Sequence, residues 1–208
     1  MIKISQAEQP ADFDEKVRRP GLRFLKEHPD ADPRDFWSAC KGELYAAYRG
    51  YCAYTTFRIV PRTDATVDHF IPKSIRRDLC YEWSNYRLCS PHANSVKKDA
   101  TGLLDPVSLP ENAFFLREDG SIEANPAAFS SENELASAVH TVSRLRLNSP
   151  ALVYDRAEHL DTLLANIAEA GPENRDAACR CAARSLRRQS RFLYEQAVRM
   201  KYIPALAD

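Results

Sequence analysis

The chain has 208 residues, of which 44% are hydrophobic and 28% are charged, and its positive and negative charges cancel. This composition excludes a disordered chain and suits one large domain, or a core module with an appended lobe. No window approaches ~18 consecutive apolar residues, and no basic segment near the start leads into an apolar run, so we expect a cytoplasmic protein without a membrane span or signal peptide. The six cysteines do not resemble a secreted disulfide framework, so we expect reduced thiols.

Three regions follow one another along the chain. Residues 1–50 are an N-terminal helical segment, with a helix predicted over 33–49 that Asp32 caps and Gly50 follows. Residues 51–110 are β-prone over 55–60 and 65–71, then carry a loop, a returning strand and a short helix over 93–100. Residues 111–208 form a mostly helical C-terminal lobe, irregular to about 130, with helices predicted over 131–147, 150–169 and 174–200.

The stretch VDHFIPKS places Asp68 directly before His69. Alone, this pair is better explained by a buried histidine whose neighbour caps a turn. Downstream, Asn85 opens the second predicted strand, and Asn94 and Lys97 follow in N-x-x-K spacing. A strand, a loop, a returning strand and a helix can bring Asp68, His69 and Asn94 around one point.

This order of residues resembles the HNH endonuclease family, most closely the modules that use asparagine as the last key residue, as in guide-directed CRISPR nucleases. The flanks FWSACKGELYAAYRGYCAY, YEWSNYRL, LLDP and TVSRLRLNSPALVYDR resemble the small HNH proteins of retron and Septu-type anti-phage systems. The resemblance implies an α+β fold in which a ββα-metal HNH core over residues 51–110 is flanked by N-terminal and C-terminal helices.

The resemblance also implies roles that the chemistry of the side chains supports. Asp68 and Asn94 offer a carboxylate and an amide oxygen, which suit one Mg²⁺ or Mn²⁺ ion better than zinc. The neutral form of His69 can take a proton from water near pH 7. Asn85 is expected to brace the loop that carries His69, and the resemblance therefore groups it with the catalytic residues. Lys97, with Lys98 beside it, is expected to meet a phosphate.

Many HNH proteins carry a structural zinc on two C-x-x-C pairs, and this sequence departs from that pattern. Thr55 stands where the second thiol of the first pair belongs, and the second pair is out of register, which leaves Cys52, Cys89 and His92. A structural zinc needs four ligands, so we expect none here. Cys52 and Cys89 are then small core residues. His92 is either an extra ligand or phosphate contact, or a turn residue that faces solvent.

The neutral total hides an uneven distribution of charge. Between residues 174 and 201 eight basic residues stand against two acidic ones, and Arg180, Arg184, Arg187, Arg188 and Arg191 recur on one helical face. This face has three possible interpretations. It is either a solvated surface, or an arm that tracks phosphates with Arg184 and Arg188 at its centre, or an arm that docks an acidic partner. A second basic cluster follows the Asp–His pair and comprises Lys73, Arg76 and Arg77.

These observations favour a metal-dependent HNH endonuclease that cuts DNA, with RNA not excluded, as the effector of an anti-phage defence system. Because a nonspecific nuclease would threaten its own cell, the neutral charge favours a companion ATPase or other activating protein, and no membrane partner is expected. The alternative is a non-catalytic nucleic-acid-binding or adaptor module that retains an HNH shape.

Overall fold

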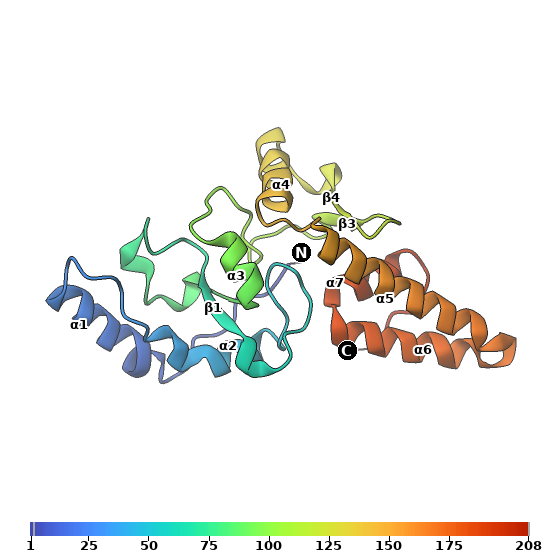
Figure 1. The fold of residues 1–208 in the computed structure, drawn as a ribbon, viewed down its shortest axis with the longest axis horizontal. Coiled ribbons are helices and arrows are strands. Elements are labelled where there is room, and N and C mark those ends of the chain that lie inside the picture. Colours follow the sequence, from blue (N-terminus) through green and yellow to red (C-terminus); the bar gives the residue numbers. More distant parts are fainter. Residues whose placement is uncertain (2, 208) are drawn as a thin grey trace.

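The structure is a computed structural model that describes residue 1 and residues 3–207. The molecule is elongated, with α1 (Arg19–Glu27) near one end and the hairpin of α5 (Pro150–Glu169) and α6 (Gly171–Gln189) at the other (Figure 1). Buried side chains from both halves nevertheless form one continuous hydrophobic cluster. The fold is therefore mixed α and β, with small antiparallel sheets, and is compatible with an HNH fold.

The central element is a two-stranded antiparallel sheet followed by a helix. β1 (Thr66–His69) pairs with β2 (Tyr86–Cys89), so that Asp68 lies opposite Arg87 and His69 lies opposite Tyr86. α3 (Pro91–Lys97) begins directly after β2 and contacts β1. Its start follows from local chemistry, because the Ser90 side chain accepts a hydrogen bond from the Ala93 amide and Pro91 occupies the first turn.

The N-terminal region begins with a π-helical turn (Asp14–Arg18) that continues into α1. The helix predicted over 33–49 is shorter, with a 3₁₀ turn over Trp37–Cys40 leading into α2 (Lys41–Ala47). The helical segment starts later than predicted because the capping residue is Asp35 and not Asp32. The Asp35 carboxylate accepts hydrogen bonds from the Ser38 amide (2.9 Å) and hydroxyl (2.7 Å).

Residues 55–60, predicted as a strand, are irregular and pair only through isolated bridges, Tyr51 with Arg58 and Phe57 with Ser190. The stretch before residue 130, predicted to be irregular, contains a second antiparallel pair, β3 (Phe114–Leu116) and β4 (Ile122–Ala124). Three-residue strands carry too few residues for a period-two pattern to stand out in the sequence.

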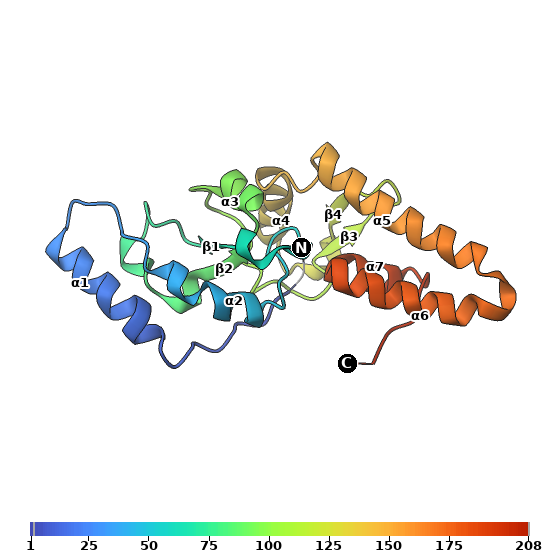
Figure 2. The same ribbon diagram turned by 60° about the horizontal axis from the view of Figure 1, so that its bottom comes forward.

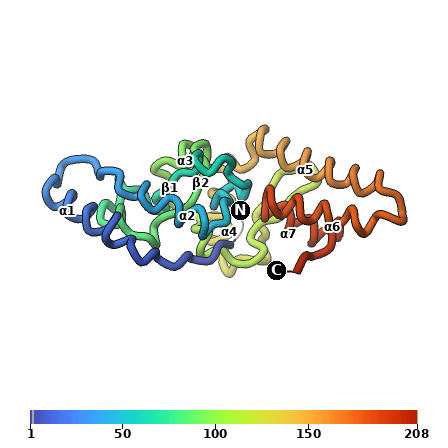
Figure 3. The backbone as a smooth tube through the Cα atoms, turned by 90° about the horizontal axis from the view of Figure 1, so that it is seen from below, coloured from blue at the N-terminus to red at the C-terminus, as the bar shows by residue number. Residues whose placement is uncertain are grey.

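The C-terminal lobe contains α4 (Glu132–Arg144), α5, α6 and α7 (Arg191–Arg199), and Figures 2 and 3 show α5 and α6 running side by side away from the sheet. The single helix predicted over 174–200 is divided at Ser190, whose backbone is extended (φ −149°, ψ 116°) and whose side chain caps α7 by accepting from the Leu193 amide. In the part of the chain that the structure describes, no helix combines the length and apolar character needed to cross a membrane.

Candidate active site

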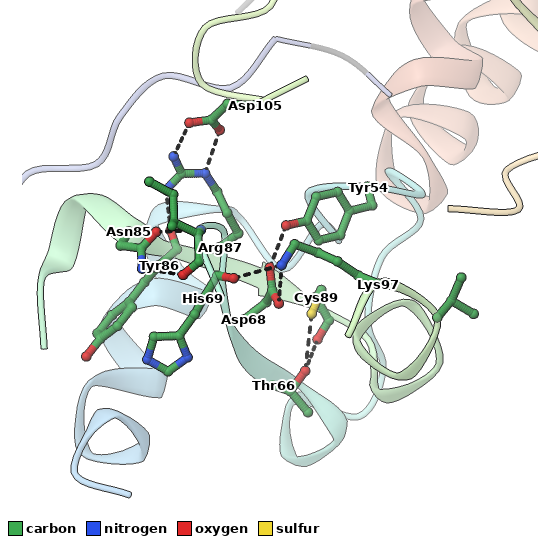
Figure 4. Close-up of polar contacts among 12 residues, drawn as sticks. Tyr54, Thr66, Asp68, His69, Asn85, Tyr86, Arg87, Cys89, Lys97 and Asp105 are labelled. Atoms are coloured by element: carbon green, nitrogen blue, oxygen red, sulfur yellow. Dashed lines mark hydrogen bonds and ion pairs between the residues drawn. The ribbon is translucent and has the colours of Figure 1, made fainter. Parts of the chain in front are cut away.

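The pair β1–β2 and helix α3 bring Asp68, His69 and Lys97 together (Figure 4). Adjacent residues of a strand point to opposite faces. Asp68 accordingly contacts Lys97 of α3, whereas the His69 ring packs against Trp37 and Tyr86.

The Asp68 carboxylate is 4% exposed and both of its oxygens have partners. Its Oδ2 accepts a hydrogen bond from the Tyr54 hydroxyl at 2.5 Å, and its Oδ1 accepts one from Lys97 Nζ at 3.1 Å. Burial, followed by the charge of Asp68, raises the pKa of Tyr54 well above its usual value. Tyr54 therefore stays protonated and serves as a donor.

Lys97 differs from the phosphate contact that its position in N-x-x-K suggested. Its side chain is fully buried, and its ammonium group donates to the His69 carbonyl at 2.7 Å as well as to Asp68. In this arrangement the charge of Lys97 stabilises the Asp68 carboxylate and the end of β1, and it does not face solvent. Its neighbour Lys98 is exposed and lies just beyond the end of α3.

The His69 ring is held in one orientation and is 9% exposed. Its Nε2 lies 2.9 Å from the Cys80 carbonyl oxygen. Because a carbonyl only accepts, Nε2 carries the proton of the neutral ring and Nδ1 carries the free lone pair. The edges of Trp37 and Tyr86 contact the ring at centroid distances of 4.6 and 5.2 Å. Burial lowers the pKa of His69 below 6.5, which favours the neutral form at pH 7.

Asn85 fastens the loop that follows His69. Its Oδ1 accepts from the Ile71 amide at 2.8 Å, and its Nδ2 donates to the carbonyls of Ile71 (3.0 Å) and Leu79 (3.2 Å). One buried amide thus holds both ends of the loop over residues 71–79. These contacts are the ones that a bracing residue requires, and the catalytic role of Asn85 stays a prediction.

Asn94 and His92 lie on α3. Asn94 is partly buried and sits one turn before Lys97, so its side chain projects from the same side of the helix as the lysine that reaches Asp68. His92 is exposed, which fits a residue that faces solvent. Its role as an extra ligand stays a prediction.

The basic residues expected to bind nucleic acid lie in two separate places. Lys73 lies near His69, with its ammonium 5.0 Å from the centre of the Trp37 ring. Arg76 pairs with Asp78, while Arg77 donates to the carbonyls of His28 and Ala31. Arg184 and Arg188 are exposed on α6, in the lobe beyond the sheet (Figure 1).

The donor set around Asp68 is compatible with a magnesium-type ion. Such an ion keeps several waters and needs only one or two protein oxygens. Each Asp68 oxygen has one hydrogen-bond partner and therefore retains acceptor capacity. Among the described residues, no group of three or more His, Cys, Asp or Glu side chains gathers in a way that could hold a metal ion. That Asp68 and the Asn94 amide would hold such an ion stays a prediction.

Cys52 and Cys89 are both free and buried. Burial, followed by the electrostatic influence of Cys52, raises the pKa of the Cys89 thiol well above its usual value. Both cysteines therefore occupy core positions, and Cys89 also contacts the Thr66 hydroxyl at 3.3 Å. The prediction that the protein carries no structural zinc stays open to elemental analysis.

Tyr54 and Trp37 were not identified from the sequence as site residues. Tyr54 sits in an irregular segment and Trp37 in a 3₁₀ turn, and neither stands at a motif spacing relative to Asp68 or His69. Both lie within the flank FWSACKGELYAAYRGYCAY that resembles small HNH proteins, but that resemblance assigns neither of them a role, and aromatic residues in such segments most often serve the core.

The chain is 28% identical over 178 residues to a curated protein of Vibrio cholerae serotype O1 biovar El Tor named "Retron Vc95 putative HNH endonuclease". The match spans 79% of this chain and 84% of that protein. No family model matches the chain. At this identity the similarity supports an HNH-like protein.

Proposed function

We propose that this protein is a metal-dependent endonuclease that hydrolyses phosphodiester bonds of DNA. The observation that carries the proposal is the antiparallel pair and helix that set Asp68, His69 and the Asn94–Lys97 turn around one point. The similarity to a protein named as an HNH endonuclease supports the same reaction.

In this proposal Asp68 and Asn94 hold one Mg²⁺ or Mn²⁺ ion. When bound, the ion would neutralise charge on a phosphoryl oxygen and stabilise the leaving oxygen. His69 Nδ1 takes a proton from the attacking water, since Nε2 is occupied by the Cys80 carbonyl. Tyr54 and Lys97 keep Asp68 oriented, and Asn85 keeps the loop after His69 in place.

We further propose that the nuclease acts as the effector of an anti-phage defence system together with a companion ATPase or other activating protein. The support is the sequence resemblance to small retron and Septu-type proteins and a relative that is named as a retron protein. The low exposure of Asp68 and His69 fits an enzyme whose site opens only when it is activated.

The same low exposure also favours a second candidate, a non-catalytic module in which the Asp68–Lys97 pair is purely structural.

Nicking of supercoiled plasmid in Mg²⁺, Mn²⁺ or EDTA, with and without the companion protein, distinguishes the nuclease from the non-catalytic module. We expect metal-dependent nicking that His69→Ala reduces by roughly 10²–10⁴-fold, the usual contribution of a positioned base. His140→Ala, which changes an exposed histidine of α4, is the matched control and should nick like the parent. No nicking by the parent under any of these conditions would favour the non-catalytic module, whereas nicking by His69→Ala equal to that of the parent would show that His69 is not the general base.

A further inference from the structure

A crevice of about 520 Å³ lies where the module that contains β1 and β2 meets the C-terminal lobe. The end of α2, residues 51–56, the N-terminal segment and the α6–α7 junction form its walls. Figures 2 and 3 both show the N-terminal segment between α2 and α7. The walls are joined, because the Tyr51 hydroxyl donates to the Arg187 carbonyl and the Arg58 amide donates to the Gln189 carbonyl at 2.8 Å. The crevice is therefore a fixed feature of the fold.

Three arginines line this crevice, Arg49 from the module and Arg187 and Arg191 from the lobe. The single acidic residue of the lining, Glu195, pairs with Arg191 at 2.9 Å. The Arg187 guanidinium lies 5.8 Å from the centre of the Tyr194 ring. Arg49 is exposed and has no ion pair within the described residues. The lining thus carries more positive than negative charge.

The backbone conformation of Arg49 is one that favours glycine, so an arginine at this position needs an explanation. Arg49 lies two residues past the last residue of α2 with φ 52°, and its amide and that of Gly50 donate to the carbonyls of Ala46 and Tyr45. Glycine is the residue that this left-handed position favours. A cation near a helix C-terminus offsets part of the strain. Arg146 ends α4 in the same way, with φ 49°, away from the crevice, and it is the natural control.

The crevice is continuous with the basic face of α6. Arg180, Arg184 and Arg188 are exposed and have no ion pairs in the described part of the chain, and Arg187 follows them to the crevice. Arg187 also donates to the Ala207 carbonyl at 3.3 Å. A row of exposed cations formed by Arg180, Arg184 and Arg188 fits a ligand with repeated phosphates better than a single small anion. We propose that the crevice binds the phosphate backbone of a nucleic-acid strand and that Arg49 carries this path from the lobe to the nuclease module. This inference rests on the proposed function and extends it.

The test measures binding of a labelled DNA duplex to the full chain in EDTA, as a function of salt, for the parent, Arg49→Gly and Arg146→Gly. We expect Arg49→Gly to weaken binding on the order of tenfold, the effect of losing a charged hydrogen bond. The plot of log affinity against log salt should flatten by about 0.9 for a lost phosphate contact. Arg146→Gly should bind like the parent. Both glycine variants should unfold at or above the temperature of the parent, since each removes a strained left-handed arginine.

Three results would overturn the inference. If Arg49→Gly binds DNA like the parent and the parent nicks plasmid, phosphate binding in the crevice is refuted, while the proposed nuclease function stands. If Arg146→Gly weakens binding as much as Arg49→Gly does, the effect comes from the loss of one positive charge anywhere on the surface and not from the crevice. Binding of ATP or inorganic phosphate to the parent without any binding of the duplex shows a small-anion site. A parent that neither binds nor nicks DNA in the presence of its companion refutes the proposed function itself.

Discussion

At the scale of single residues, the Asp68 carboxylate depends on two donors that come from different parts of the chain. Tyr54 approaches from the irregular segment before β1, and Lys97 approaches from the last turn of α3. Since the lysine is fully buried and also bonds the His69 carbonyl, it links the helix to both residues of the Asp–His pair. The orientation of this candidate metal ligand is thereby fixed by the protein itself.

We expect Lys97→Met to destabilise the fold by about 3–5 kcal/mol, because it leaves the buried Asp68 charge without its partner. Urea unfolding measures this loss. Lys98→Met, one residue away on an exposed side chain, should change the free energy of unfolding by less than about 0.5 kcal/mol. A similar small change for both variants would mean that Lys97 does not hold Asp68 in solution.

The pH dependence of cleavage should follow His69. Its pKa is lowered below 6.5, first by burial, so the neutral base persists to lower pH than in an exposed histidine. Single-turnover cleavage should therefore stay constant from pH 8 down to about 6.5 and fall only below it, as His69 becomes protonated. An acid limb centred above about pH 6.5 would mean that another group controls the reaction or that the site is more open.

The residues of the motif could be found from sequence, whereas their partners could not. Asp68, His69, Asn85 and Asn94 stand in a fixed order that a family resemblance preserves. Whether Lys97 points to solvent or to Asp68 depends on how closely α3 packs against β1, and this packing cannot be inferred from the spacing of residues along the chain. The same limit hid Tyr54, because no spacing along the chain indicates that its hydroxyl meets Asp68.

At the scale of secondary-structure elements, the break between α6 and α7 is the feature that joins the lobe to the module. Ser190 is 1% exposed, caps α7 through its side chain and contacts the Thr56 hydroxyl at 3.3 Å. The helical periodicity runs through this position without a glycine or proline, so the sequence predicted one helix. The break arises because Phe57 forms a backbone bridge to Ser190, which is a long-range contact.

Ser190→Ala should cost about 2 kcal/mol of unfolding free energy, because it removes a helix cap and a buried hydrogen bond together. Ser131→Ala is the matched control, since Ser131 caps α4 in the same manner but is exposed, and it should cost about 1 kcal/mol. Chemical denaturation of the two variants supplies the comparison. Equal losses would show that the contact between Ser190 and Thr56 contributes nothing beyond the cap.

At the scale of the whole molecule, a neutral chain is divided into parts of unlike charge. Eight basic and two acidic residues lie between positions 174 and 201, so the remaining chain is acidic on balance. The basic part comprises most of α6, which projects away from the sheet beside α5, and α7 (Figure 1). Such a separation allows α6 and α7 to attract a polyanion that the rest of the surface does not attract.

Replacing Arg184 and Arg188 with glutamine tests what this lobe attracts. If α6 tracks phosphates, DNA affinity should fall and the slope of log affinity against log salt should flatten by up to about 0.9 for each lost contact on duplex DNA. The chemical step in saturated complexes should persist, because neither arginine lies near His69.

The control is a double variant with the same loss of charge at the other end of the molecule. It replaces Arg19 and Arg23, which are exposed and four residues apart on α1. If both pairs lower affinity equally, the effect is general electrostatics and α6 has no special role. If the α6 pair leaves DNA binding unchanged but abolishes co-purification with the companion protein, the lobe is a docking arm for an acidic partner, and the nuclease depends on that partner for its substrate.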